Sequence, residues 1–249
     1  MTMTAWRPVQ GTYALQDNEV HVWRATLSTA APVLPALRAV LAPQERARAD
    51  RFHFEADRAR HTIGRALTRL LIGHSLGVDP RGLTFEYSRH DKPMLAGAAP
   101  LQFNVSHSGD VVLLALARSR ELGVDVERIR ADFTTTDIAE RYFSAVECRD
   151  LATLAGEARH NAFFACWSRK EAYIKARGDG LTLALDSFDV AFLPGETPRL
   201  VATRHDPPAV ARWSLRDLDV GPGYRGALVA ERSDWTLALW DWRGETDCG

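Results

Sequence analysis

The chain has 249 residues, of which 46% are hydrophobic and 25% charged, and its formal net charge is -1. This length and composition are typical of one large or two small globular domains with an ample core. A near-neutral charge counts against a nucleic-acid scaffold, which is usually strongly basic, and no apolar run is long enough to predict a transmembrane helix.

The first residues and the cysteines both favour a cytoplasmic location. Residues 1–7 lack a basic start followed by an apolar run, so no signal peptide is predicted. The cysteines match no zinc-binding spacing and we interpret them as reduced thiols: Cys148, Cys166 and Cys248. We therefore expect a cytoplasmic protein whose partners include neither a membrane nor a nucleic acid.

The first half of the chain combines short strands with one long helical stretch. Alternating residues predict a strand over 20–28. Pro43 then precedes a helical pattern over 44–76, whose second part has apolar residues at helical spacing. Three further strands, separated by turn-forming proline and glycine, are predicted at 83–88, 101–105 and 111–117.

The same order of elements begins again after residue 120. A strand over 122–127 leads into a helical stretch over 137–177, with breaks near Ser144 and Gly156. Four strand-like runs follow, at 187–193, 211–218, 224–231 and 235–240. Connections this short exclude a doubly wound parallel sheet.

We therefore expect an α+β fold of two similar lobes in a pseudo-twofold arrangement. The N-terminal lobe is predicted over 1–120 and the C-terminal lobe over 121–249. Each is expected to contain a small, mostly antiparallel sheet packed on a long helix, with the active site at the interface between the lobes.

Two acidic residues of the strand predicted over 122–127 point to the same side. Alternate residues of a strand share a face, so Asp125 and Glu127 project together while Val124 and Val126 face a core. The two acidic Cα atoms should be about 6.6 Å apart, close enough to share one cation. Because two carboxylates on one face repel each other, this pattern indicates a metal site.

A third carboxylate lies inside the apolar stripe of the last long helix. At about 100° per residue, the stripe consists of Phe163, Phe164, Trp167 and Ile174. Glu171 falls near its centre, where an ionised group is costly unless it is paired or bound to metal. Taken alone, a buried salt bridge to an arginine explains Glu171 as well as a metal does. Beside Asp125 and Glu127 the metal is favoured, and oxygen-only ligands favour Mg²⁺.

Cationic groups for an anion accompany these carboxylates. Lys170 and Lys175 lie near the two edges of the apolar stripe. Seven arginines also crowd the helical stretch 44–76; most are interpreted as a solvated helix face, and one or two are suited to holding a phosphate. Lys92, followed by Pro93 in a loop, carries almost no information by itself.

A polar run follows the strand predicted over 101–105. Ser106, His107 and Ser108 bring together hydroxyls, an imidazole and turn amides, which suit a phosphate. On the residues alone, an ordinary surface turn explains this run better. Ser106 also lacks the flanking glycines of a nucleophile elbow, so we do not predict a serine nucleophile.

Six segments in this order resemble a known family. They are 60–67, 92–93, 103–108, the strand motif GVDVE at 123–127, the helix motif WSRKEAYIK at 167–175, and 180–188. The strand and helix motifs at this separation are the most specific. The chain resembles the 4′-phosphopantetheinyl transferases, in particular their larger, monomeric Sfp-type class, over roughly residues 43 to 230.

The resemblance implies transfer of the 4′-phosphopantetheine arm of coenzyme A to a serine of an apo acyl, polyketide or peptidyl carrier protein, with release of 3′,5′-ADP. It implies Mg²⁺ held by Asp125, Glu127 and Glu171. Lys175 would neutralise the pyrophosphate and Glu171 would accept the serine proton. Asp125, Glu171 and Lys175 are therefore the expected catalytic residues.

Further basic and polar residues are expected at the coenzyme. The full set is Arg48, Arg60, Lys92, Ser106, His107, Lys170 and Lys175. Arg60, with Arg48, is expected at the ribose 3′-phosphate. The family often has lysines where the sequence here reads QERAR at 44–48, and arginine differs from lysine in reach, so the residue at this phosphate remains open.

Two other functions remain open. A Mg²⁺-dependent phosphodiesterase or nucleotide hydrolase would use the same three carboxylates and attack with water. A non-catalytic carrier-binding module is disfavoured by Glu171, whose place in an apolar stripe is expensive for a passive surface. Tyr142 and Phe143 are candidate contacts for a carrier, although ordinary core residues explain them better.

Overall fold

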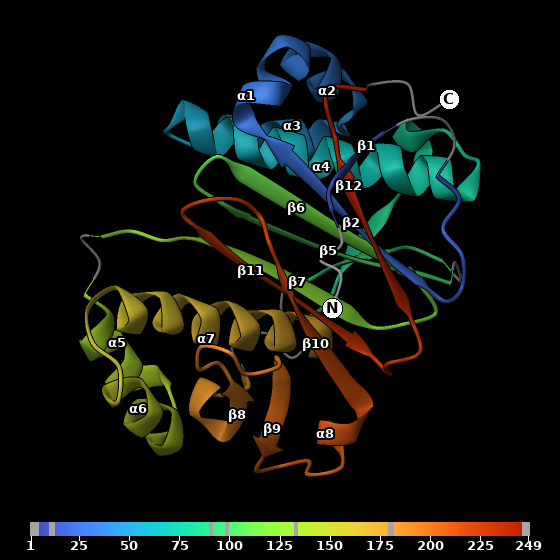
Figure 1. The fold of residues 1–249 in the computed structure, drawn as a ribbon. Helices are drawn as coiled ribbons and strands as arrows, with labels where there is room; N and C mark the ends of the chain where they lie inside the picture. Colours follow the sequence, from blue (N-terminus) through green and yellow to red (C-terminus); the bar gives the residue numbers. More distant parts are fainter. Residues whose placement is uncertain are drawn as a thin grey trace. The chain divides into compact units, whose positions relative to one another are not determined.

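A computed structural model describes residues 5–9, 13–89, 92–97, 100–131, 134–178 and 182–245. Contacts divide the chain into two compact units. Unit 1 comprises Met1–Ser88, Pro93–Arg120 and Asp234–Gly249, and unit 2 comprises Arg89–Lys92 and Glu121–Ser233. Helices and small sheets alternate in both units (Figure 1), which confirms the α+β class.

Unit 1 is built on a five-stranded sheet in the order β1-β12-β2-β6-β5. Its strands are β1 (Arg7–Pro8), β2 (Glu19–Thr26), β5 (Leu101–Ser108), β6 (Val111–Arg118) and β12 (Thr236–Asp241). β12 pairs in parallel with β1 and β2, and the other neighbours are antiparallel. Two short strands, β3 (Phe85–Tyr87) and β4 (Pro93–Leu95), form a separate antiparallel pair.

The described residues of unit 1 also form four α-helices and two 3₁₀ turns. They are α1 (Leu27–Ala30), η1 (Ala31–Val33), α2 (Leu34–Val40), α3 (Pro43–Asp50), α4 (Glu55–Leu76) and η2 (Pro80–Gly82). The long helix α4 packs on β5 and β6. Its buried face, which includes Ile63, Leu67 and Leu71, joins Trp23 and Phe103 of the sheet in one apolar core.

The single helix predicted over 44–76 is two helices, α3 and α4, separated by residues 51–54. The side chain of Glu45 explains the break. It accepts a hydrogen bond from the Ala42 backbone N–H at 2.9 Å and pairs with Arg65 and Arg69 of α4. In one continuous helix, Glu45 and Arg65 would be about 30 Å apart along the axis. Pairing of these residues therefore requires α3 to fold back on α4.

The strand predicted over 101–105 continues to Ser108, so Ser106 and His107 lie within β5 rather than in a turn. Ser108 pairs directly with Val111, which leaves a two-residue loop. Gly109, the first residue of that loop, has a φ of 57°. This conformation suits glycine at the first central position of a tight hairpin.

Unit 2 contains a three-stranded antiparallel sheet in the order β10-β11-β7. Its strands are β7 (Leu122–Arg128), β10 (Trp213–Leu218) and β11 (Tyr224–Glu231). Its helices are α5 (Thr135–Tyr142), α6 (Ala145–Ala152), α7 (Gly156–Arg177) and α8 (Ala209–Arg212). The predicted helix breaks near Ser144 and Gly156 are confirmed, because Ser144 caps α6 and α7 begins at Gly156.

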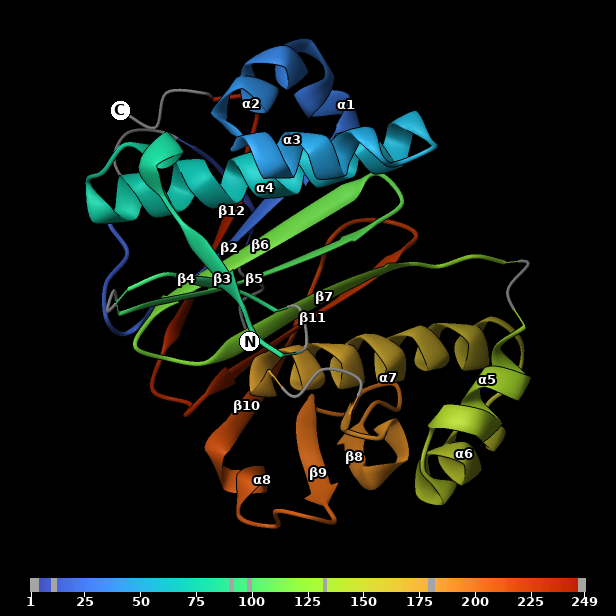
Figure 2. The same cartoon turned by 180° about the vertical axis from the view of Figure 1, so that it is seen from behind.

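The helix α7 packs on β7 and β11. A hairpin of β8 (Phe188–Ala191) and β9 (Arg199–Thr203), preceded by the 3₁₀ turn η4 (Leu185–Ser187), lies beside α7 in both Figure 1 and Figure 2. Phe163, Phe164 and Tyr173 of α7 are buried in the core of this unit. The strand β9 was not predicted from the sequence.

The last strand, β12, belongs to unit 1 and not to the lobe predicted over 121–249. It pairs with β2 from Thr236↔Glu19 to Asp241↔Arg24. Sequence order could not reveal this, because the partner strand lies near the other end of the chain. Within the described residues, none of the helices has the combination of length and apolarity that crossing a bilayer needs.

Candidate active site on β7 and α7

Strand β7 and helix α7 approach very closely at Gly123. A Cβ atom built on Gly123 would lie 2.2 Å from the Ala172 carbonyl oxygen and 2.3 Å from the Ala176 backbone nitrogen. No side chain fits between a strand and a helix at this spacing. Because alternate residues of a strand share a face, Asp125 and Glu127 lie on the same side of β7 as Gly123, the side that faces α7.

Asp125, Lys175 and Glu171 form one electrostatically coupled group. Asp125 is 3% exposed, and its Oδ1 accepts a hydrogen bond from Lys175 Nζ at 2.6 Å. Glu171, one helical turn before Lys175, is half-buried. Burial raises the pKa of Glu171; the Lys175 ammonium opposes this shift and the Asp125 carboxylate adds to it. The structure therefore brings these three predicted residues together.

The described part of the chain contains no preformed group of three or more His, Cys, Asp or Glu side chains able to hold a metal ion. Mg²⁺, however, is commonly bound through one or two carboxylates together with substrate phosphates and water. The Asp125 carboxylate contributes to the raised pKa of Glu171, and both residues supply such carboxylates. Glu127 is half-buried two residues beyond Asp125 on the same face of β7. These residues fit a Mg²⁺ ion that binds along with a phosphate.

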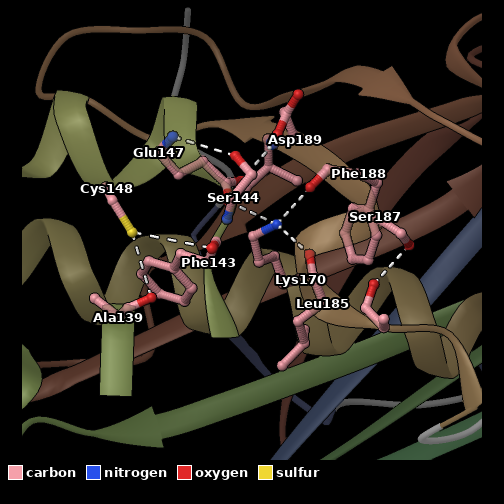
Figure 3. Close-up of polar contacts among 12 residues, drawn as sticks. Ala139, Phe143, Ser144, Glu147, Cys148, Lys170, Leu185, Ser187, Phe188 and Asp189 are labelled. Carbon is pink, nitrogen blue, oxygen red and sulfur yellow. Dashed lines mark hydrogen bonds and ion pairs between the residues drawn. The ribbon is translucent and has the colours of Figure 1, made fainter. Parts of the chain in front are cut away.

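Lys170 lies in a different environment from Lys175. Its side chain is 0% exposed, and Nζ pairs with Glu147 at 2.7 Å and donates to the carbonyls of Leu185 at 2.8 Å and Phe188 at 2.6 Å (Figure 3). An ammonium group has three N–H donors, and these contacts use all of them. The structure thus corrects the expectation that Lys170 binds the coenzyme.

Lys92 lies at the C-terminal end of α7. It pairs with Glu121, the residue before β7, at 3.3 Å. Its Cδ is 3.7 Å from where a Cβ of Gly178 would be, and Gly178 ends α7 with a φ of 72°. The structure therefore places Lys92 and Lys175 near the same end of one helix.

Arg60 and His107 lie toward one end of the unit 1 sheet. Arg60 of α4 donates to the Gly109 carbonyl in the β5–β6 turn at 2.6 Å and pairs with Asp57 at 2.5 Å. His107 is exposed two residues before that turn. Ser106 is buried, and as the neighbouring strand residue it points to the opposite face from His107. The two side chains therefore lie on opposite faces of β5 and not in the ordinary surface turn that the residues alone favoured.

Arg48 is exposed on α3. Burial lowers the pKa of His61 on α4, and the charges of Arg48 and Arg65 lower it further. Arg48 therefore contributes to a positive potential over the start of α4, which is compatible with an anion but does not identify one. Two residues of the family-like segment 180–188, Gly180 and Leu181, and also Cys248, lie outside the described residues.

Sequence reasoning missed Glu147. Its carboxylate is buried and accepts hydrogen bonds from the backbone N–H groups of Ser144 at 3.0 Å and Val190 at 2.9 Å. The Ser-x-x-Glu spacing from Ser144 is a capping-box signal that predicts the start of a helix. Nothing in the local sequence indicates that Lys170 is its partner.

Comparisons with known proteins cover most of the chain. The family described as "4′-phosphopantetheinyl transferase superfamily" matches residues 121–238, and "4′-phosphopantetheinyl transferase, N-terminal" matches residues 23–119. The 4′-phosphopantetheinyl transferase HetI of Nostoc sp. is 34% identical over 243 residues, which is 96% of this chain and 99% of that protein.

A second relative and a solved structure give partial matches. The 4′-phosphopantetheinyl transferase Sfp of Bacillus subtilis is 31% identical over 196 residues, or 78% of this chain and 84% of its own. The holo-[acyl-carrier-protein] synthase of Thermotoga maritima covers 45% of this chain and 63% of its own at 22% identity, with a TM-score of 0.36. This structural likeness is too limited to bear on function.

Proposed function

We propose that this chain, which belongs to the 4′-phosphopantetheinyl transferase superfamily, transfers the 4′-phosphopantetheine arm of coenzyme A to a serine hydroxyl of an apo carrier protein. The second product is 3′,5′-ADP. The observation that carries the chemistry is the coupled group of Asp125, Glu171 and Lys175, built where β7 meets α7.

The transfer is a displacement at phosphorus. The serine oxygen forms a bond to the phosphorus on the pantetheine side of the pyrophosphate, and the bond from that phosphorus to the bridging oxygen breaks. The hydroxyl proton passes to Glu171, whose raised pKa brings it closer to the pH at which a general base works best. Lys175 meets the negative charge that develops on the departing phosphate.

We place a Mg²⁺ ion with Asp125 and Glu171, and with Glu127 beside them. When bound, this ion supplies neutralisation of the pyrophosphate charge. Lys175 is 28% exposed, so its ammonium is able to turn from Asp125 toward a phosphate oxygen. One proposed metal ligand, Asp125, and the proposed phosphate contact, Lys175, are thus partners in one ion pair.

The remaining coenzyme contacts stay proposals. Lys92 is placed at the pyrophosphate with Lys175, because both lie toward the C-terminal end of α7. The other proposed contacts are Ser106 and His107 at phosphate groups and Arg60, with Arg48, at the ribose 3′-phosphate.

A carrier protein is the proposed macromolecular partner. Tyr142 on α5 and Val146 on α6 are 37% and 41% exposed and offer apolar contacts, whereas Phe143 is 4% exposed and belongs to the core. We further propose that the enzyme acts as a monomer in the cytoplasm.

Mass spectrometry of apo carrier proteins incubated with coenzyme A, Mg²⁺ and this protein tests the function. Transfer adds the phosphopantetheine arm to the carrier and releases an equal amount of 3′,5′-ADP. A nucleotide hydrolase would cleave the coenzyme and leave every carrier mass unchanged. A passive binding module would bind a carrier and release no 3′,5′-ADP.

Asp125→Ala tests the site within that assay. We expect turnover to fall at least about 100-fold with the fold retained, because one carboxylate of the proposed metal site is lost. Asp217→Ala is the matched control, since Asp217 is also a strand carboxylate that pairs with a cation of α7, Arg169, at 2.5 Å. Equal turnover of the two variants would show that Asp125 is not part of the active site.

Glu171→Gln tests the proton acceptor. Because an amide does not accept the serine proton as a carboxylate does, we expect turnover to fall by about 100-fold or more. A variant that binds Mg²⁺ normally and keeps near wild-type turnover would show that Glu171 is not the base.

A further inference from the structure

Lys170 is the residue next to Glu171, yet its side chain lies inside the protein. Its ammonium has one carboxylate partner, Glu147, and two carbonyl partners, Leu185 and Phe188. Figure 3 shows this nitrogen among the three groups, with Phe188 alongside. The ammonium also lies 4.2 Å from the centre of the Phe188 ring, a favourable position for a cation.

The partners of Lys170 belong to three other elements of unit 2. Glu147 lies on α6, Leu185 begins η4, and Phe188 begins β8. Glu147 extends the connection, because its other carboxylate oxygen accepts the backbone N–H of Val190 in β8. The Lys170–Glu147 pair therefore joins α6, η4 and β8 to one point on α7.

This point lies nearly opposite the contact of α7 with β7. At about 100° per residue, Ala172 and Ala176, which meet β7, lie about 200° and 240° around the helix from Lys170. Glu171 and Lys175 lie about 100° and 140° around it, on the flank between the two contacts. The helix is therefore held on two sides, and the proposed site residues project from the side between them.

Stability alone does not explain a charged pair at this place. Removing two charges from water is costly, and apolar residues of similar volume often stabilise a core as well or better. The pair instead fixes the orientation of α7, because three short contacts from one atom, Lys170 Nζ, define the rotation of the helix about its axis. We propose that Lys170 is a positioning residue, which fixes through Glu147 and residues 185–188 the rotation of α7 that sets Glu171 and Lys175 beside Asp125.

This inference rests on the proposed transferase function, and a neutralised pair tests it. Lys170→Met with Glu147→Gln removes both charges and keeps an acceptor for the Val190 N–H. We expect this double variant to melt within a few degrees of the wild type. We expect its kcat to fall about 10- to 100-fold, as when residues that orient metal ligands are changed, with little change in the KM for coenzyme A. Mg²⁺ affinity, measured by calorimetry in the presence of coenzyme A, should fall with kcat.

Leu200→Ala is the control for destabilisation. Leu200 is a buried core residue of β9, outside α7 and the partners of Lys170. This variant should melt earlier than the wild type and keep wild-type kcat per folded molecule. Wild-type kcat in the double variant would overturn the proposal, as would a loss of activity that merely follows its unfolded fraction.

Hydrogen exchange on the wild-type protein gives a second test that needs no variant. Amides of α7 around Lys170 and of β8 should exchange with similar protection, because one ammonium ties both segments. Much faster exchange in β8 would overturn the proposal even if the double variant fails to fold. If the wild type modifies no carrier, the transferase function fails, while the exchange and Mg²⁺ measurements still report on Lys170.

Discussion

The two long helices of the molecule have the same length but differ in how they use charged residues. α4 (Glu55–Leu76) and α7 (Gly156–Arg177) have 22 residues each, and each packs on an antiparallel pair of strands. On α4, the buried Arg69 and the half-buried Arg65 both pair with Glu45 of α3.

Helix α7 instead carries two kinds of pair within the six residues 170–175. Lys170 is closed inside the unit with Glu147, whereas Lys175 meets Asp125 at a strand that also faces the half-buried Glu171. A charge on an apolar helix face is therefore not by itself a sign of a site. The residue that pairs with the charge determines whether the charge is structural or belongs to a site. That residue comes from a distant segment of the chain.

The two helices also differ in how closely a strand approaches them. Alanine at Gly123 of β7, which faces α7, and at Gly64 within α4 tests this difference most strongly. In Gly123→Ala, the new Cβ would meet backbone atoms of α7 at 2.2 and 2.3 Å. We expect a loss of about 3 kcal/mol or more in unfolding free energy and a fall in turnover of at least about 100-fold.

Gly64→Ala in α4 is the matched change. Its Cβ would come no closer than 3.4 Å, to a methyl group of Val105. Alanine favours a helix interior over glycine by up to about 1 kcal/mol, so stability should stay equal or rise. Urea denaturation of both variants makes the measurement, and similar losses in both would contradict the difference between the helices.

Glu45→Gln should separate stability from activity. Two arginines of α4 would lose a buried carboxylate, and we expect unfolding free energy to fall by about 3 kcal/mol. Turnover per folded molecule should remain near the wild-type value, in contrast to Asp125→Ala. Adding Arg69→Met should recover part of the stability, because one uncompensated cation is then removed. A double variant less stable than Glu45→Gln would show that Arg69 stabilises chiefly through other contacts.

We expect the Glu45 carboxylate to have a smaller effect as well, on how stability depends on pH. Burial raises the pKa of Glu45, but the hydrogen bond from Arg69 and the charge of Arg65 outweigh it, so the net shift is downward. The unfolded chain then binds the proton more tightly than the folded protein. The stabilisation is complete above the ordinary glutamate pKa and is lost as pH falls through the folded-state value. Unfolding free energies from denaturation curves across this acidic range should therefore fall more steeply with decreasing pH in the wild type than in Glu45→Gln.

Lys92→Met should produce the smallest change. Loss of one charge-assisted hydrogen bond should raise the KM for coenzyme A about tenfold while kcat stays nearly constant. Glu121→Gln is the companion variant, because it releases Lys92 from its carboxylate partner and should leave the KM equal or lower. An unchanged KM in Lys92→Met would place this side chain outside the coenzyme site.

Local patterns predicted much of this structure because they depend on neighbouring residues. Period-two alternation located β2 and β7, flanking turn-forming residues located β6, and helical spacing located α4 and α7. The same alternation put Asp125 and Glu127 on one face, and the placement of Glu171 in an apolar stripe correctly marked an unusual residue.

Other features depend on contacts between distant segments and left no local signal. The break between α3 and α4 follows from the reach of Glu45 to Arg65 and Arg69. Lys170 and Lys175 flank the same stripe, and only the fold shows that the first pairs internally with Glu147. The spacing of residues shows in which direction each side chain projects from a helix, but it does not identify the residues that pack there.

The return of β12 to unit 1 has a consequence for synthesis on the ribosome. Apart from Arg89–Lys92, unit 2 lies between β6 and β12 in the chain, so one edge of β2 stays unpaired while β7 to β11 are synthesised. The sheet of unit 1 is completed only once β12 has emerged from the ribosome. Until then the open edge of β2 is exposed to pairing with another chain, and a chain truncated before residue 236 should keep that edge open.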